Sequence, residues 1–298
     1  MNTQAFPRIV MVTGSDSGYM HLLRGMIETL SLDPRAQVID KRCMDLGLNE
    51  TDRAWLHGHG VETFKPHWHF GIADGQFSPT QAGLVARPHL REYLPGYDIY
   101  LWVDCDLWIQ DWSAIAAFLD GAERKGLAIA HEVHPGYRHQ LWLYRWMLTH
   151  WVLGYGIMDG LWLMSRPHCN AGMFAMTADA PHWQLWREAF QRAYERTGRI
   201  IPHDQFALNQ VIHGGYGKAP AVETAILPAR CNWICDRGIP MWNDSLRAYC
   251  EPVSPFTPLG VLHLAGPAKR TAYDIQRTAG AVSARASSPA LRRRYKAP

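Results

Sequence analysis

The hydrophobic pattern opens with a strand, a turn and a helix. Residues 8–13 form a short apolar run, residues 14–18 are small and polar, and residues 19–30 carry large apolar side chains at helical spacing. In open α/β sheets, ligands bind beyond the carboxyl ends of the strands, so the loop is a candidate nucleotide site. The loop lacks a glycine-rich phosphate motif, and an ordinary turn in which Ser and Asp cap the helix is an equally good interpretation.

The rest of the chain continues this alternation of strands and helices. Apolar runs predict further strands at 36–40, 99–103, 127–130, 169–176, 225–228 and 260–264. Helical spacing predicts helices at 81–94 (with a break at Pro88), 111–119, 182–197 and 202–210. This order predicts one α/β domain at 1–281 around a mixed, mostly parallel central sheet.

A tryptophan-rich stretch at about 141–164 interrupts the alternation. Its length is near that of a membrane span, but Arg145, His150 and Asp159 fall within it, and charges at that depth are costly. We predict a buried or interfacial helical insertion that does not cross a membrane. Its role is either acceptor binding or packing in the core.

The strand at 99–103 runs directly into Asp104-Cys105-Asp106. In a continuous strand, the two acids would point to the same side. Buried carboxylates must be neutralised, and carboxylate oxygens suit Mg²⁺ or Mn²⁺, which share their remaining positions with phosphates and water. The pattern predicts a metal–diphosphate site; the alternative is a pair of acids that cap a helix or face solvent, since two acids at this spacing are common.

Composition narrows the class of protein. Apolar residues make up 47% and charged residues 19% of the 298, which is typical of a globular chain, and the net charge of +3 does not indicate a nucleic-acid partner. The 13 tryptophans suggest aromatic platforms for sugars or a membrane surface, or a large core. Six scattered cysteines favour free thiols, and no signal peptide is evident, so we expect a cytoplasmic protein.

Residues 282–298 form a basic tail that is poor in apolar residues, and we predict that it is disordered. Two interpretations remain open. Either the tail is simply solvated, or together with the tryptophan-rich stretch it holds the protein at the inner face of an anionic membrane.

The order of motifs resembles the glycosyltransferases of the GT-A fold, most closely family 8, which are retaining and use sugar nucleotides. The matching stretches are 101–106, 170–174, 203–205, 227–233 and the closing His263-x-x-Gly266-x-x-Lys269. The resemblance covers roughly residues 8–270. Two features depart from the family pattern: Cys105 stands between the two acids, and the insertion has no counterpart.

The resemblance implies roles for particular residues. Asp104, Asp106 and His263 would hold Mn²⁺ or Mg²⁺, and Asp204 and Gln205 would act at the sugar. The implied donor-binding residues are Thr13, Gly14, Asp16, Arg87, Asn170, Ala171, Gly266 and Lys269.

The implied reaction moves a hexose from a nucleotide-diphospho-sugar, with UDP-sugar favoured, to a saccharide or lipid-linked saccharide with retention of anomeric configuration. Two other classes stay open. A sugar nucleotidyltransferase would release pyrophosphate, and a non-enzymatic carbohydrate-binding module would use the tryptophans as platforms.

Overall fold

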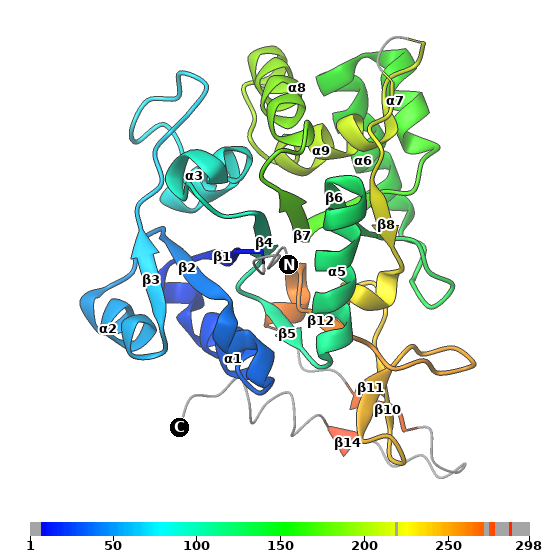
Figure 1. Cartoon of the computed structure of the whole chain (residues 1–298). Coiled ribbons are helices and arrows are strands. Elements are labelled where there is room, and N and C mark those ends of the chain that lie inside the picture. The colour runs from blue at the N-terminus through cyan, green and yellow to red at the C-terminus, as the bar shows by residue number, and fades with distance from the viewer. Residues whose placement is uncertain (1–6, 218–219, 271–273, 278–285, 288–298) are drawn as a thin grey trace, which may run out of the picture.

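The computed structural model describes residues 7–217, 220–270, 274–277 and 286–287. Its central sheet has seven strands in the order β3-β2-β1-β4-β7-β6-β8 (Figure 1). The strands are β1 (Ile9–Ser15), β2 (Asp40–Asp45), β3 (Val61–Phe64), β4 (Ile99–Val103), β6 (Leu127–His131), β7 (Cys169–Thr177) and β8 (Ala225–Leu227). Within this sheet β7 alone runs antiparallel to its neighbours. The predicted mixed, mostly parallel sheet is therefore confirmed.

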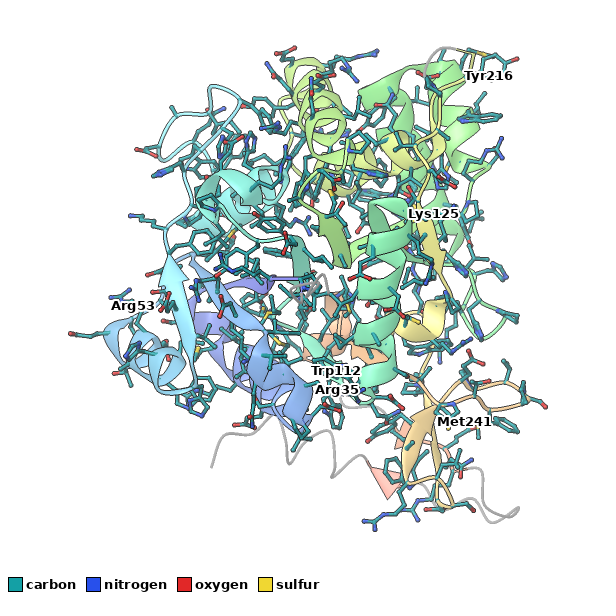
Figure 2. The ribbon with its side chains drawn as sticks, in the orientation of Figure 1. Arg35, Arg53, Trp112, Lys125, Tyr216 and Met241 are labelled. Carbon is teal, nitrogen blue, oxygen red and sulfur yellow. The ribbon has the colours of Figure 1, made fainter. Side chains whose placement is uncertain are left out.

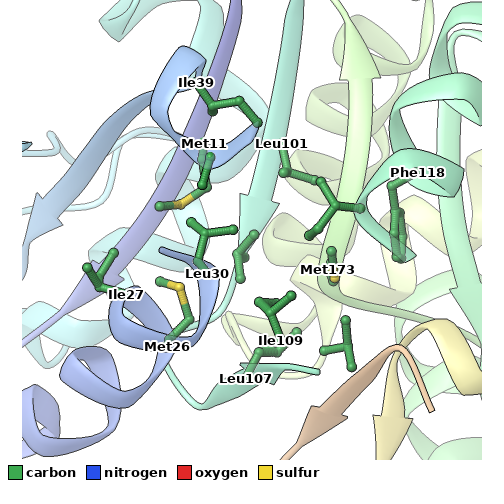
Figure 3. Close-up of a cluster of buried hydrophobic side chains, with 14 of the residues drawn as sticks. Met11, Met26, Ile27, Leu30, Ile39, Leu101, Leu107, Ile109, Phe118 and Met173 are labelled. Carbon is green, nitrogen blue, oxygen red and sulfur yellow. The ribbon is translucent and has the colours of Figure 1, made fainter. Parts of the chain in front are cut away.

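Helices cover both faces of the sheet. They are α1 (Met20–Leu30), α2 (Glu50–Gly58), α3 (Pro79–Ala86), α4 (Leu90–Tyr93), α5 (Trp112–Lys125), α6 (Leu141–Tyr155), α7 (Ile157–Met164), α8 (His182–Thr197) and α9 (His203–His213). Figure 3 shows the core on one face, where Leu30 of α1 and Phe118 of α5 pack on Met11, Leu101 and Met173. The opposite core is formed by α3, α8 and α9.

Helix α5 is fixed at both ends. At its start, the Arg35 guanidinium carbon lies 5.2 Å from the centre of the Trp112 ring (Figure 2). At its other end Lys125 forms an ion pair with Glu223.

A second, smaller sheet lies next to the end of β4. It contains β5 (Leu107–Ile109), β12 (Val261–His263) and β9 (Trp233–Ile234), with β12 in the middle. The chain leaves the central sheet at Val103 and enters the small sheet at Leu107, so the expected continuous strand is wrong: Asp104 and Asp106 lie in a turn between two strands. Pairing of β12 with β5 brings His263 to these acids.

The prediction of a strand at 36–40 is also wrong. Residues Pro34–Val38 form a 3-10 turn, because the Asp33 carboxylate accepts from the Arg35 backbone N–H and Pro34 follows that cap. The strand β2 begins only at Asp40, and one of its polar residues bonds back to this turn. The Lys41 ammonium donates to the Ala36 carbonyl at 2.7 Å.

The tryptophan-rich insertion is helical, as predicted, but it consists of two helices. The break falls at Gly156, whose φ of 91° favours glycine. The buried face of α6 packs on α8 and α9, where Trp151 stacks on Phe206 with ring centres 3.9 Å apart. No helix within the described ranges is long and apolar enough to cross a membrane.

The predicted tail at 282–298 lies outside the described residues, apart from the two-residue strand β14 (Ala286–Ser287). That strand pairs antiparallel with β13 (Asp274–Ile275). A further two-stranded unit is formed by β10 (Met241–Asn243) and β11 (Ala248–Cys250).

Candidate active site

The site forms where the strand order of the central sheet reverses direction. Strand β1 pairs with β2 on one side and with β4 on the other, both in parallel. The carboxyl ends of β1 and β4 therefore flank a topological switch point, the place where open α/β sheets bind ligands. Gly14 lies near the end of β1, Asp16 directly follows that strand, and Asp104 directly follows β4.

Three ligand-type side chains converge there. The candidate ligand atoms of Asp104, Asp106 and His263 all lie within 4.8 Å of one another. The His263 Nε2 atom is 3.5 Å from an Asp106 carboxylate oxygen and 3.9 Å from an Asp104 oxygen. Two carboxylates and one imidazole form a donor set that suits Mn²⁺, and this group fits the metal implied by the sequence.

A chain of buried hydrogen bonds orients His263. Its Nδ1 atom bonds the Asn232 side-chain oxygen at 3.0 Å, and the Asn232 amide donates to the Asn170 oxygen at 3.0 Å. The Gly172 N–H donates to that same oxygen at 2.9 Å. With Nδ1 donating to Asn232, Nε2 is the ring nitrogen that faces the two acids, and such a fixed orientation is what a histidine needs to bind a metal.

The buried side chain of Arg87 connects Asp204 and Asp104 to strand β7. The Arg87 guanidinium forms an ion pair with Asp204, donates to the Ala171 carbonyl at 2.8 Å, and lies 4.0 Å from an Asp104 oxygen. Next to it, Gln205 accepts from the Ala171 N–H at 2.9 Å. Asp204 and Gln205 are thus fixed in place by the backbone of β7.

Burial and charge set the protonation of these groups. Burial raises the pKa of Asp104, and Arg87 offsets only part of that effect. Burial acts in the same direction on Asp106, but His263 and Lys269 outweigh it and hold the pKa of Asp106 below its usual range. Burial also raises the pKa of Asp204 against the opposing effect of Arg87. Asp106 is thus well compensated by protein cations, whereas Asp104 has room for another positive charge.

Two cavities meet at the acids. One of about 330 Å³ is lined by Gly14, Asp16 and Tyr19. The other, of about 340 Å³, is lined by Asp204, Gln205 and residues of α6. Both are also lined by Leu84, Asp104, Asp106, Ile201 and Lys269. The two cavities therefore lie on either side of a boundary that contains the side chains of Asp104, Asp106 and Lys269.

Most of the predicted site residues line one of these cavities, but two do not. Arg87, Asn170 and Gly266 line the cavity that contains Asp204. Thr13 is fully buried in β1, and Ala171 is fully buried in β7, where it contributes its backbone groups alone.

Sequence reasoning missed several lining residues. Glu132 and Arg237 form an ion pair at 2.6 Å, and the Asn170 amide donates to Glu132 at 2.6 Å. His168 bonds the Gln205 side chain at 2.7 Å. No local pattern signals such a pairing, because Glu132 and Arg237 are far apart in the chain and each stands in an irregular segment.

Comparison with known proteins identifies the fold. No protein-family model matches this sequence, and no curated protein does either. Among solved structures, the galactosyltransferase LgtC, in complex with donor and acceptor sugar analogues, is 18% identical, with a TM-score of 0.52 over 87% of this chain and 88% of its own.

Two further solved structures are similar. The glycosyltransferase GlyE of Streptococcus pneumoniae is 16% identical, with a TM-score of 0.50 over 87% of this chain and 55% of its own. The bifunctional glycosyltransferase WbbM is 12% identical, with a TM-score of 0.52 over 89% and 47%. The chain shares the fold of these glycosyltransferases. The expected α/β GT-A fold is confirmed, and at these identities the likeness extends to the fold alone.

Proposed function

We propose that the protein is a metal-dependent glycosyltransferase. It would transfer a hexose from a nucleotide-diphospho-sugar, with UDP-sugar favoured, to a saccharide or lipid-linked saccharide, with retention of configuration. The meeting of two cavities at Asp104, Asp106 and Lys269 carries this proposal. The nucleotide would occupy the cavity beside Gly14 and Asp16, and the sugar the other, so that the diphosphate crosses the boundary.

A bound Mn²⁺ or Mg²⁺ would supply positive charge opposite the diphosphate, and an imidazole ligand favours Mn²⁺. The residues Asp104, Asp106 and His263 would hold it. Lys269, whose ammonium lies 3.0 Å from Asp106, would offset the charge that develops on the leaving nucleoside diphosphate.

Retention requires either a double displacement or attack from the same face. A double displacement needs a carboxylate that is free to attack the anomeric carbon. Asp204 is paired with Arg87, and Glu132 is paired with Arg237. We therefore favour same-face attack, in which a leaving diphosphate oxygen helps to deprotonate the acceptor. Asp204 and Gln205 would orient the sugar and stabilise its developing positive charge.

Product analysis by NMR tests the proposal. The protein is incubated with UDP-hexoses, Mn²⁺ and a panel of saccharide acceptors. We expect UDP release and a glycoside with the donor's anomeric configuration. Pyrophosphate release would instead indicate a nucleotidyltransferase, an inverted product would exclude the retaining mechanism, and sugar binding without turnover or metal dependence would indicate a binding module. A glycosyl ester trapped on Asp204 or Glu132 would exclude same-face attack.

A further inference from the structure

The insertion carries an unusual concentration of exposed apolar side chains. Of the 16 large apolar side chains that are exposed in the described part of the chain, eight lie on α6 and α7. On α6, Trp142 (66% exposed), Trp146 and Leu153 recur at helical spacing, and on α7 Ile157 and Leu161 are four residues apart. We call these five side chains, with Leu141, the insertion face.

The insertion is anchored to the rest of the fold by other side chains of α6. Trp151 and Tyr155 are buried against α9, so the exposed apolar side chains are not needed to hold the insertion in place. Water-exposed apolar surface of this extent marks a site of contact with another molecule or with a membrane. Figure 1 shows α6 and α7 at the periphery, away from α1 and α2.

The charged side chains within residues 138–166, which include the insertion face, are almost all positive. Arg138, Arg145 and Arg166 are exposed, and the Arg166 guanidinium lies 3.6 Å from the centre of the Trp162 ring. Asp159 is the one acid between residues 138 and 166, and it accepts a hydrogen bond from the Tyr216 N–H at 2.7 Å. A two-fold dimer through this face would bring the arginines of two copies together, which is unfavourable. Anionic headgroups complement them instead.

The insertion face continues into the candidate active site. Leu143, Trp146 and Met147 of α6 line the cavity that contains Asp204 and Gln205. Tryptophan and tyrosine are enriched where proteins meet the boundary between lipid and water, and Trp142, Tyr144 and Trp146 are all exposed here.

We propose that the insertion face docks on the surface of an anionic bilayer. Helices α6 and α7 lie in the plane of the surface, with the apolar side chains among the headgroups and the arginines against lipid phosphates. This places the opening of the Asp204 cavity at the lipid–water boundary, where an amphiphilic substrate is presented. The docking does not depend on the proposed sugar transfer.

Vesicle flotation of the full-length protein tests the docking, without any sugar nucleotide. The vesicles contain either phosphatidylcholine alone or phosphatidylcholine with phosphatidylglycerol. We expect binding to the anionic vesicles, and at least a roughly tenfold weaker partition for the double variant Trp142→Ser/Ile157→Ser, because apolar burial and charge act together. Arg145→Glu/Arg166→Glu should remove the preference for anionic lipid.

The matched control is Val38→Ser/Leu246→Ser, which removes two exposed apolar side chains far from the insertion in sequence and should bind as the wild type does. Equal vesicle binding by wild type and Trp142→Ser/Ile157→Ser would overturn the proposal, as would no binding by the wild type. A dimer in sedimentation velocity that this variant dissociates, without vesicle binding, would assign the face to a second copy instead. Since turnover is not measured, failure here leaves the proposed function standing.

Discussion

Asp104 and Asp106, only two residues apart, occupy different environments. The Asp104 side chain is 33% exposed and accepts from the Trp102 indole N–H at 2.7 Å. The Asp106 side chain is 4% exposed and is paired with Lys269 at 3.0 Å. Replacing Asp104 would therefore remove a proposed metal ligand with little other change, whereas replacing Asp106 would also leave Lys269 and His263 without their carboxylate partner.

We expect Asp104→Asn and Asp106→Asn each to lower turnover by at least about 100-fold, because each weakens electrostatic stabilisation of the leaving group. Asp106→Asn should also lower the melting temperature, and Asp104→Asn should not. Steady-state kinetics with Mn²⁺ and thermal melts check this. Activity that survives Asp104→Asn, or survives thorough chelation, would show that these acids do not hold an essential metal.

Gly172 leaves space beside His263 and Asp104, two of the proposed metal ligands. A Cβ at this position would lie 2.4 Å from the His263 ring and 2.9 Å from an Asp104 oxygen. If His263 and Asp104 bind the metal as proposed, Gly172→Ala should displace both side chains and weaken Mn²⁺ binding and turnover. Gly58→Ala is the matched control, since a Cβ there meets nothing within 4 Å and alanine favours the helix. Unchanged Mn²⁺ affinity in Gly172→Ala would contradict the ligand geometry.

His203 links stability to pH. Burial lowers the pKa of His203 to about 4, and neither ring nitrogen has a hydrogen-bond partner within the described part of the chain. Because the unfolded chain binds the proton more tightly, this stability is present above about pH 6.5 and is lost as pH falls toward 4. The full difference corresponds to about 3 kcal/mol.

His203→Leu should therefore make the melting temperature less sensitive to pH between about 6.5 and 4. The matched control is His57→Leu at an exposed position, which should retain the dependence of the wild type. Parallel pH profiles for wild type and His203→Leu would show that His203 does not contribute to acid sensitivity.

At the scale of elements, α6 supports the start of α9. Trp151 is buried and stacks on Phe206, and Asp204 and Gln205 immediately precede Phe206. Trp151→Ala should cost about 3–5 kcal/mol of stability and lower turnover, since Asp204 and Gln205 lose the packing that supports them. Trp142→Ala, at an exposed position on the same helix, should change stability by less than about 0.5 kcal/mol. Denaturant melts of both variants distinguish packing from a local surface effect.

The sequence predicts most elements because their apolar spacing is strong, and it fails where local chemistry competes. At Asp33-Pro34 a helix cap and a proline produce a turn that runs into the stretch at 36–40, where the apolar residues predict a strand. The strand β3 was not predicted, since Val61–Phe64 is short and includes Glu62, which pairs with Arg42. In such edge strands tertiary pairing, and not apolar periodicity, decides the structure.

The candidate site follows the same rule. Two local sequence motifs signal part of the site, and the fold brings their residues together: Asp104, Asp106, His263 and Lys269. Glu132 and Arg237 were missed because their pairing arises only when β6 and the segment after β9 come together. A sequence pattern reports spacing along the chain, whereas the ion pair depends on three-dimensional packing.

At the scale of the whole molecule, the switch point and the insertion each contribute to one of the two cavities. The ends of β1 and β4 place the proposed nucleotide cavity beside Asp104 and Asp106, and α6 with α9 encloses the other cavity. Asp104 and Asp106, two of the proposed metal ligands, lie at the boundary between the cavities. This organisation predicts that nucleotide and metal bind together, since each supplies charge that the other needs.

Thermal shift with sugar nucleotides tests that claim most directly. Wild type and Asp104→Asn are melted with UDP-hexose alone, with Mn²⁺ alone and with both. A ligand at 100 times its dissociation constant stabilises the native state by about 2.7 kcal/mol, so a specific donor is readily detected. We expect UDP-hexose and Mn²⁺ together to raise the melting temperature of the wild type by more than the sum of their separate shifts. Asp104→Asn should lose this excess. An excess that persists in Asp104→Asn, or no shift with any sugar nucleotide, would contradict this expectation.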